Sequence, residues 1–108
     1  MDAPKFMNKI QKRTLFREGV FERDNRKCKM CGKKEDLDAH HITDRHEISN
    51  GGYVLSNGIS LCDECHWKAE QYHMTLGKHH VEGFHPDDLY KKINSSYEIA
   101  CKDSSNSK

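Results

Sequence analysis

The sequence predicts one small domain of the α+β class, in which a bound metal holds a helix and two short strands together. Three observations support this prediction. The chain has 108 residues, a length at which a single core is expected. A helical pattern is followed by two strand patterns and then by further helical patterns. Two Cys-x-x-Cys pairs, in a chain that is only 34% hydrophobic, indicate that a metal supplements a small core.

Several classes of protein are excluded by the same sequence. No stretch of about 18 apolar residues is present, so no transmembrane helix and no membrane partner are expected. The first residues lack the apolar segment of a signal peptide, so we expect a cytoplasmic protein with reduced cysteines. In that compartment five cysteines indicate metal binding rather than disulfides.

Charge is distributed unevenly along the chain, although the net charge is only +1. Residues 1–34 contain eleven Lys and Arg against four Asp and Glu, whereas residues 35–108 contain seven against thirteen. On charge alone, a solvated helix surface is the simpler interpretation of the basic segment. An anionic partner at this end, beside metal chemistry in the histidine-rich remainder, is the alternative.

The first predicted element is an amphipathic helix over residues 12–23, with Leu15, Phe16 and Val20 on one face. A tight turn between two thiols follows at residues 28–32.

Two short strands are predicted at residues 37–42 and 58–61, joined by a polar loop over residues 43–57. Two strands alone are marginally stable, so another element must hold them. The thiol pairs, which flank both strands, are suited to do so.

Two further helices are predicted after the strands. One spans residues 63–75 with Asp63 as its N-cap, and the other spans residues 86–93 with Pro86 at its first position. The tail, residues 101–108, is polar and is predicted to lack regular structure.

The two Cys-x-x-Cys pairs are separated by thirty residues. Two residues between thiols let both sulfurs reach one metal from a single turn, and two such turns complete a tetrahedral zinc site. A redox dithiol and a pair of disulfides are the alternatives, but the βαβ pattern of a redox protein is not visible. Four thiolates leave no open position on the ion, so we expect one structural Zn²⁺ held by Cys28, Cys31, Cys62 and Cys65.

Between and beside the thiol pairs lie polar residues suited to catalysis. Adjacent residues of a regular strand point to opposite faces. His40 and His41 can therefore take different roles, one as a metal ligand and one as a free base, only if the strand twists or ends there. Asn57 precedes the second strand, and His66 directly follows the last thiol of the second pair. One face of the predicted helix also carries further candidate ligands at helical spacing: His66, Glu70 and His73.

The order and spacing of these motifs resemble those of HNH endonucleases, which have a ββα-metal fold with zinc-bound cysteines. The resemblance covers residues 12–75, with a motif core at residues 23–75, and implies one nuclease domain over residues 1–100 with flanking N- and C-terminal helices. The matching motifs are Arg23-Asp24-Asn25, Cys28-x-x-Cys31-Gly32, His40-His41-Ile42, Gly51-Gly52, Asn57 and Leu61-Cys62-x-x-Cys65-His66.

The resemblance also implies a role for each motif residue. His41 matches the general base, and Asn57 matches the asparagine that ties the loop backbone and orients this base. His40 and His66 match the ligands of a catalytic divalent ion. Some relatives have a third ligand, a histidine, where this chain has Glu70, and the role of Glu70 is therefore open.

The function expected from the resemblance is metal-dependent hydrolysis of DNA phosphodiester bonds. A divalent ion neutralises charge on the phosphate oxygens, and an imidazole accepts the proton of the attacking water. We expect Mg²⁺ or Mn²⁺ as the catalytic ion, with Ni²⁺ or Co²⁺ also possible for imidazole ligands. The alternative is a catalytically inactive zinc-binding module that docks on nucleic acid or protein.

DNA is accordingly the expected partner, in a bacterium or a phage-infected host. No recognition helix with base-reading side chains is evident, so we expect either weak sequence preference or specificity supplied by a homodimer or a protein partner. The residues expected to contact backbone phosphates are Arg13, Arg17, Arg23, Arg26 and Lys27.

Overall fold

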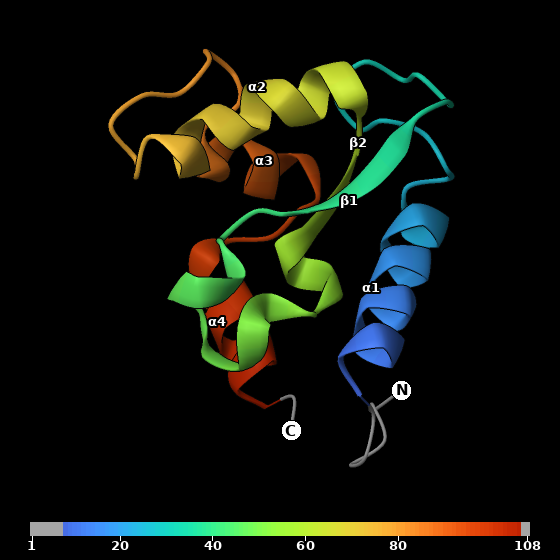
Figure 1. Cartoon of the computed structure of the whole chain (residues 1–108), viewed down its shortest axis with the longest axis vertical. Coiled ribbons are helices and arrows are strands. Elements are labelled where there is room, and N and C mark those ends of the chain that lie inside the picture. Colours follow the sequence, from blue (N-terminus) through green and yellow to red (C-terminus); the bar gives the residue numbers. More distant parts are fainter. Residues whose placement is uncertain (1–7, 107–108) are drawn as a thin grey trace.

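The computed structural model describes residues 8–106, which form four α-helices around a two-stranded sheet (Figure 1). The predicted α+β class and the order of the elements are confirmed. The elements are α1 (Lys9–Arg23), β1 (Leu37–His41), β2 (Gly58–Cys62), α2 (Asp63–Met74), α3 (Pro86–Lys92) and α4 (Tyr97–Ser105).

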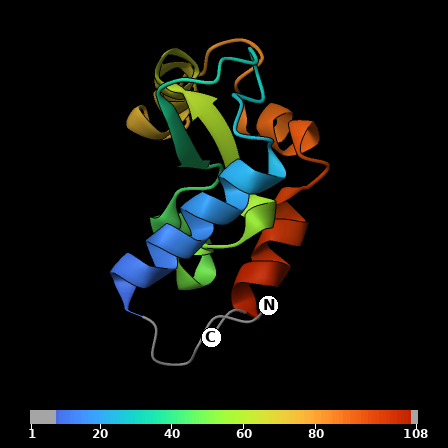
Figure 2. The same ribbon diagram turned by 90° about the vertical axis from the view of Figure 1, so that its right-hand side faces the viewer.

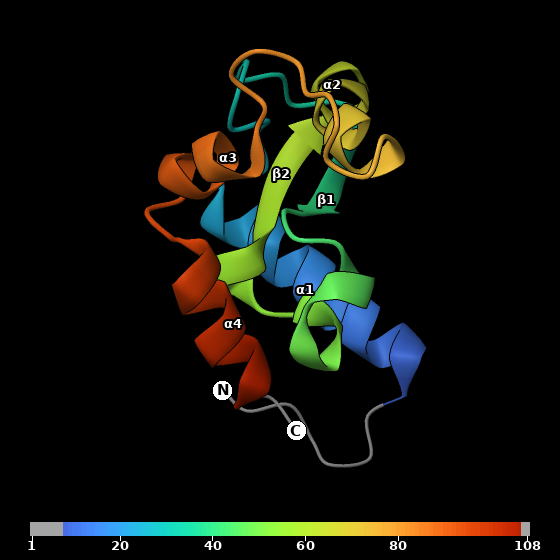
Figure 3. The ribbon, with the colours of Figure 1, turned by 90° about the vertical axis from the view of Figure 1, so that its left-hand side faces the viewer.

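The two strands pair antiparallel, with Leu37 opposite Cys62 and His41 opposite Gly58. Figures 2 and 3 view the molecule from opposite sides and show α1 in front of the sheet in one and behind it in the other. Gly58 permits this close packing, because a Cβ atom there would lie 2.5 Å from Val20 and 2.7 Å from Phe16 of α1. The opposite face of the sheet carries Ile59 and meets α2.

The predicted helix boundaries shift where a cap is present. The helix predicted over residues 12–23 begins at Lys9, because Asn8 and Gln11 form a capping box. The N-cap of α2 is Cys62 rather than Asp63, and its sulfur accepts a hydrogen bond from the N–H of Cys65. The thiol pair therefore also organises the start of this helix.

Residues 43–57, which we call the asparagine loop, contain three short 3-10 turns: Arg45–Glu47, Ser49–Gly52 and Leu55–Asn57. Gly52 lies at φ +66° and packs closely against Asn57. A Cβ atom at this position would lie only 2.4 Å from the amide nitrogen of Asn57. The loop is thus folded tightly upon the asparagine.

The prediction that residues 101–108 lack regular structure is wrong for residues 101–105, which belong to α4. Ser96 caps this helix, and Ala100 and Ser104 are fully buried. The hydroxyl of Ser104 accepts a hydrogen bond from the N–H of Gly52 (3.1 Å) and donates to the carbonyl of Ser49. Hydrogen bonds with the asparagine loop thus hold this segment in a helix, although its polar composition is typical of a disordered tail.

Arg23 and Asp24 connect the end of α1 to the start of β2. The guanidinium of Arg23 pairs with the carboxylate of Asp24 through two hydrogen bonds of 2.8 and 2.9 Å, and it also donates to the carbonyl of Gly58. The buried carboxylate of Asp24 accepts a hydrogen bond from the N–H of Ser60. This pair has a structural role, and the expected contact of Arg23 with DNA stays a prediction.

No helix within residues 8–106 combines the length and apolar character needed to cross a membrane.

Candidate metal centre and catalytic cleft

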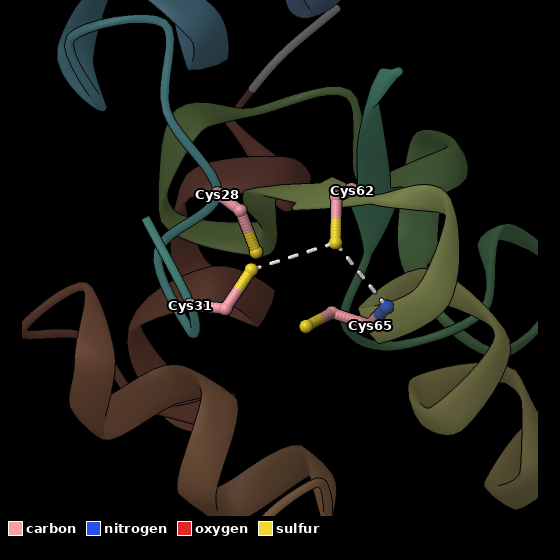
Figure 4. Close-up of side chains that lie close together, drawn as sticks. All are labelled: Cys28, Cys31, Cys62 and Cys65. Atoms are coloured by element: carbon pink, nitrogen blue, oxygen red, sulfur yellow. Dashed lines mark hydrogen bonds between the residues drawn. The ribbon is translucent and has the colours of Figure 1, made fainter. Parts of the chain in front are cut away.

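The four motif cysteines meet at one point between the turn after α1 and the junction of β2 with α2 (Figure 4). Their sulfur atoms lie within 4.8 Å of one another, and the sulfurs of Cys31 and Cys62 are 3.6 Å apart. A tetrahedral ion with Zn–S bonds of about 2.3 Å places its sulfurs about 3.8 Å apart. All of the cysteines are free thiols. The cluster therefore fits a structural zinc ion, and no two of its sulfurs are bonded to each other.

The surroundings of Cys28 favour the ionised form of its thiol. Its burial opposes the charged form, but hydrogen bonds from backbone groups of Cys62, Cys31 and Met30 lower the pKa of Cys28 to about 7. Metals bind the thiolate form of cysteine, so these backbone groups favour the form that zinc requires.

His40 and His41 point to opposite sides of β1, which ends at His41. His40 is only 2% exposed and faces α2, where its Nδ1 lies 3.3 Å from the carboxylate of Glu70. Nε2 of His66 lies 3.1 Å from the same carboxylate, and the His40 and His66 rings are 5.2 Å apart. His66 thus faces the strand, as the sequence predicts.

His40, His66 and Glu70 form a second cluster whose potential ligand atoms lie within 4.8 Å of one another. Nε2 of His40 is buried and has no hydrogen-bond partner among the described residues. Hydrogen bonds with His40 and His66 hold the pKa of Glu70 well below its usual range, so its carboxylate is ionised. Two imidazoles and a carboxylate suit a divalent transition-metal ion. The structure thus brings Glu70, whose role is open from the sequence, into the cluster.

His41 lies on the α1 side of the strand. Its ring stacks on Phe16 at a centroid distance of 4.5 Å and meets the edge of Tyr53 at 4.8 Å. Burial, and then the charge of His40, lower the pKa of His41 to about 4. His73, the remaining candidate ligand of α2, instead contacts the backbone carbonyl of His41 through its Nε2 at 3.1 Å.

Asn57 is fully buried and holds the asparagine loop by its side chain. Its amide nitrogen donates to the carbonyls of Thr43 and Gly52, and its Oδ1 accepts from the N–H of Thr43 at 2.9 Å. Tyr90 of α3 donates a further hydrogen bond of 2.7 Å to the same Oδ1. The Tyr90 hydroxyl is also 2.6 Å from the hydroxyl of Thr43, and burial raises its pKa to about 12. The asparagine thus fixes the chain two residues after His41.

Replacing Tyr90 with phenylalanine is expected to lower the free energy of unfolding by about 1–3 kcal/mol, because the hydroxyl of Thr43 then loses its partner in a buried site. Urea denaturation of the zinc-loaded protein measures this difference. Tyr72→Phe is the matched control, since the Tyr72 hydroxyl has no hydrogen bond within residues 8–106. Equal stabilities of the two variants would contradict the expected role of Tyr90.

A cleft of about 450 Å³ runs along β1 between α1 and α2 and includes both histidines of the strand. Of the residues expected to contact phosphates, Arg13 and Arg17 line this cleft, although Arg17 also pairs with Asp38 at 3.0 Å. Arg26 pairs with Glu18 outside the cleft, and Lys27 is exposed outside it. The residues that complete the walls include Asp44, Arg45, His46 and Tyr53.

Sequence reasoning missed three of the residues that shape this site: Arg45, Tyr53 and Tyr90. The first two lie in the polar asparagine loop, where the sequence has no periodicity that would indicate a direction for a side chain. Tyr90 lies in a predicted helix, but its contact with Asn57 spans thirty-three residues and has no local signal.

Comparison with known proteins agrees with the motifs. Residues 28–72 match the family described as HNH endonuclease, which confirms the resemblance predicted from the sequence. The matched segment begins at the first thiol and ends in α2, so it contains both clusters and Asn57. No curated protein and no solved structure matches the chain.

Proposed function

From the premise that residues 28–72 are of the HNH endonuclease type, we propose that the protein is a metal-dependent DNA endonuclease. The observation that carries the proposal is that two neighbouring histidines of β1 have different surroundings. His40 enters a cluster of potential ligands, whereas His41 stays outside that cluster but borders the same cleft. A binding module has no need for a separate imidazole beside a metal site.

His41 is the proposed general base. Because burial lowers its pKa to about 4, the imidazole is neutral at pH 7 and holds a lone pair for the proton of water. A phosphate anion in the cleft raises this pKa toward the range in which an imidazole is an effective base. Phe16 and Tyr53 fix the plane of the ring, and Asn57 fixes the backbone that follows it.

His40, His66 and Glu70 are the residues that would hold the divalent ion. When bound, such an ion neutralises the charge that develops on the phosphoryl and leaving oxygens during hydrolysis. The proposed ion is Mg²⁺ or Mn²⁺, and the imidazole ligands also suit Ni²⁺ and Co²⁺. The four thiols are proposed to hold zinc in a structural role, because they leave no coordination position open.

DNA is proposed to enter the cleft along β1, with Arg13 and Arg17 on the wall formed by α1. One cleft cuts one strand at a time, so a double-strand cut requires a second copy of the chain or a second binding event. The proposal therefore expects nicks before linear products.

A supercoiled-plasmid assay tests the proposal. The zinc-loaded protein is incubated with plasmid and Mg²⁺, Mn²⁺, Co²⁺ or Ni²⁺, and a parallel reaction receives EDTA. Nicked plasmid that appears only with an added ion supports the nuclease. No cleavage with any of the four ions would favour the inactive docking module, in which the His40, His66 and Glu70 contacts are only structural.

Replacing His66 with alanine is expected to lower the nicking rate by roughly 10²–10³, since a catalytic ion supplies several kcal/mol to the transition state. The zinc content, measured by elemental analysis, should stay at about one per chain, because His66 is not in the thiol cluster. His79→Ala is the matched control, as His79 is exposed and lies outside the cleft. Loss of zinc from the His66 variant would show that the two metal sites are misassigned.

A further inference from the structure

The walls of the cleft differ in charge. The part between β1 and α2 carries the carboxylates of Asp38 and Glu70 beside His40 and His66, which suits a cation. The walls from α1 and the asparagine loop carry three arginines, Arg13, Arg17 and Arg45, against a single carboxylate, that of Asp44. A cleft with this arrangement attracts a ligand that is anionic at more than one position.

Arg13 and Arg45 line the cleft together with the phenol of Tyr53. Burial opposes ionisation of this phenol, but the guanidinium groups of Arg45 and Arg13 beside its oxygen lower its pKa. Both arginines are exposed, and Tyr53 is half-buried with its ring against His41 and Phe16. One guanidinium group from α1, one from the asparagine loop and the hydroxyl of Tyr53 therefore lie near the proposed base.

Within residues 8–106, these two arginines differ from the other arginines in forming no ion pair with a carboxylate. Arg17, Arg23 and Arg26 each pair with a carboxylate, at 3.0, 2.8 and 3.2 Å respectively. Within residues 8–106, neither Arg13 nor Arg45 forms such a pair. Two like charges brought together repel each other, and an anion between them removes this repulsion.

We propose that Arg13, Arg45 and the hydroxyl of Tyr53 bind a second phosphate of the DNA strand, adjacent to the phosphate that is cleaved. The inference rests on the proposed function, which places the cleaved phosphate between His41 and the His40, His66 and Glu70 cluster. The Tyr53 site lies on the other side of the His41 ring, so it is occupied by a neighbouring phosphate of the same strand. Guanidinium groups suit this ligand, because their paired N–H donors match two phosphate oxygens.

The proposal has a consequence for substrate choice. A substrate with a single phosphodiester, such as bis(4-nitrophenyl) phosphate, reaches the cleavage site but leaves the Tyr53 site empty. DNA fills both sites. Loss of Arg45 should therefore lower the use of DNA by a larger factor than hydrolysis of the small diester, on which Arg45 acts only through its charge near His41.

The binding experiment measures affinity for a short labelled duplex by fluorescence anisotropy over a series of salt concentrations. It uses protein with one equivalent of zinc and no other divalent ion, so that cleavage does not interfere. Arg45→Ala and Arg13→Ala should each lower the slope of log affinity against log salt by about 0.9, the value for one phosphate contact. Lys102→Ala is the matched control, because it removes one exposed positive charge on α4 outside the cleft.

Two more variants separate charge from geometry. Arg45→Lys keeps the charge and should keep the salt slope, but it should bind several-fold more weakly because it lacks the paired donors. Tyr53→Phe keeps the ring against His41 and should also weaken binding without changing the slope.

Slopes for Arg45→Ala and Arg13→Ala equal to that of Lys102→Ala would overturn the phosphate site, as would a parent protein that does not bind the duplex. An equal loss of activity on DNA and on bis(4-nitrophenyl) phosphate in Arg45→Ala would also overturn it. A parent protein that binds DNA with these slopes but cleaves neither substrate would instead contradict only the proposed nuclease function.

Discussion

Replacing Cys62 with serine is expected to abolish zinc binding and folding together. Cys62 is fully buried, its sulfur lies 3.6 Å from that of Cys31, and it also caps α2. Structural zinc sites of small domains bind with an apparent free energy of about 10–16 kcal/mol, which equals or exceeds the whole stability of a typical domain. Circular dichroism and elemental analysis of the purified variant should show an unfolded chain without zinc.

Cys101→Ser provides the matched control for this experiment. Cys101 is partly buried in α4 but lies outside the thiol cluster, so this variant should retain its fold and about one zinc per chain. A Cys62→Ser protein that is folded and free of zinc would refute a structural role for the metal. The exposed Cys31 should behave like Cys62, because its sulfur completes the same tetrahedron.

Replacing His41 with alanine is expected to lower the rate of DNA nicking by roughly 10²–10⁴, the usual contribution of a positioned general base. DNA affinity and zinc content should change little, since His41 is in neither metal cluster. Single-turnover nicking measures the rate, and anisotropy with the labelled duplex measures the affinity.

The control for His41→Ala must account for packing, because the ring stacks between Phe16 and Tyr53. The melting temperature of the variant shows whether the loss of this contact unfolds the protein, and His79→Ala shows the effect of losing an exposed histidine. A folded His41→Ala protein that nicks DNA at the parental rate would eliminate His41 as the base.

The thiol cluster and the position of His66 opposite β1 were predictable because their signals are local. Each Cys-x-x-Cys pair is one turn of chain, so its spacing alone brings two sulfurs together. Side chains alternate along a strand, so the sequence did not show how His40 and His41 could serve the same site from opposite faces. The answer is geometric: the strand ends at His41, and the cleft runs along it and meets both of its sides.

What the sequence left open depends on contacts between distant segments. Glu70 is a candidate ligand of open role in the sequence, and its position beside His40 and His66 shows that it enters the cluster. The end of α4 is held by hydrogen bonds between Ser104 and the backbone of the asparagine loop, and these contacts span more than fifty residues of sequence. The ion pair of Arg23 with the buried carboxylate of Asp24 likewise has no signal in the spacing of the motif.

The hydrogen bonds that hold the asparagine loop also set how much of the chain a complete site requires. All four thiols, His40, His41 and Asn57 lie within residues 28–72, the segment that matches the HNH family. Tyr90 and Ser104, which hold Asn57 and its loop, lie beyond that segment. A fragment that ends before Tyr90 therefore carries every residue of the HNH motif but lacks the partners that fix its loop. α3 and α4 thus belong to the smallest unit in which the hydrogen bonds of the loop are complete.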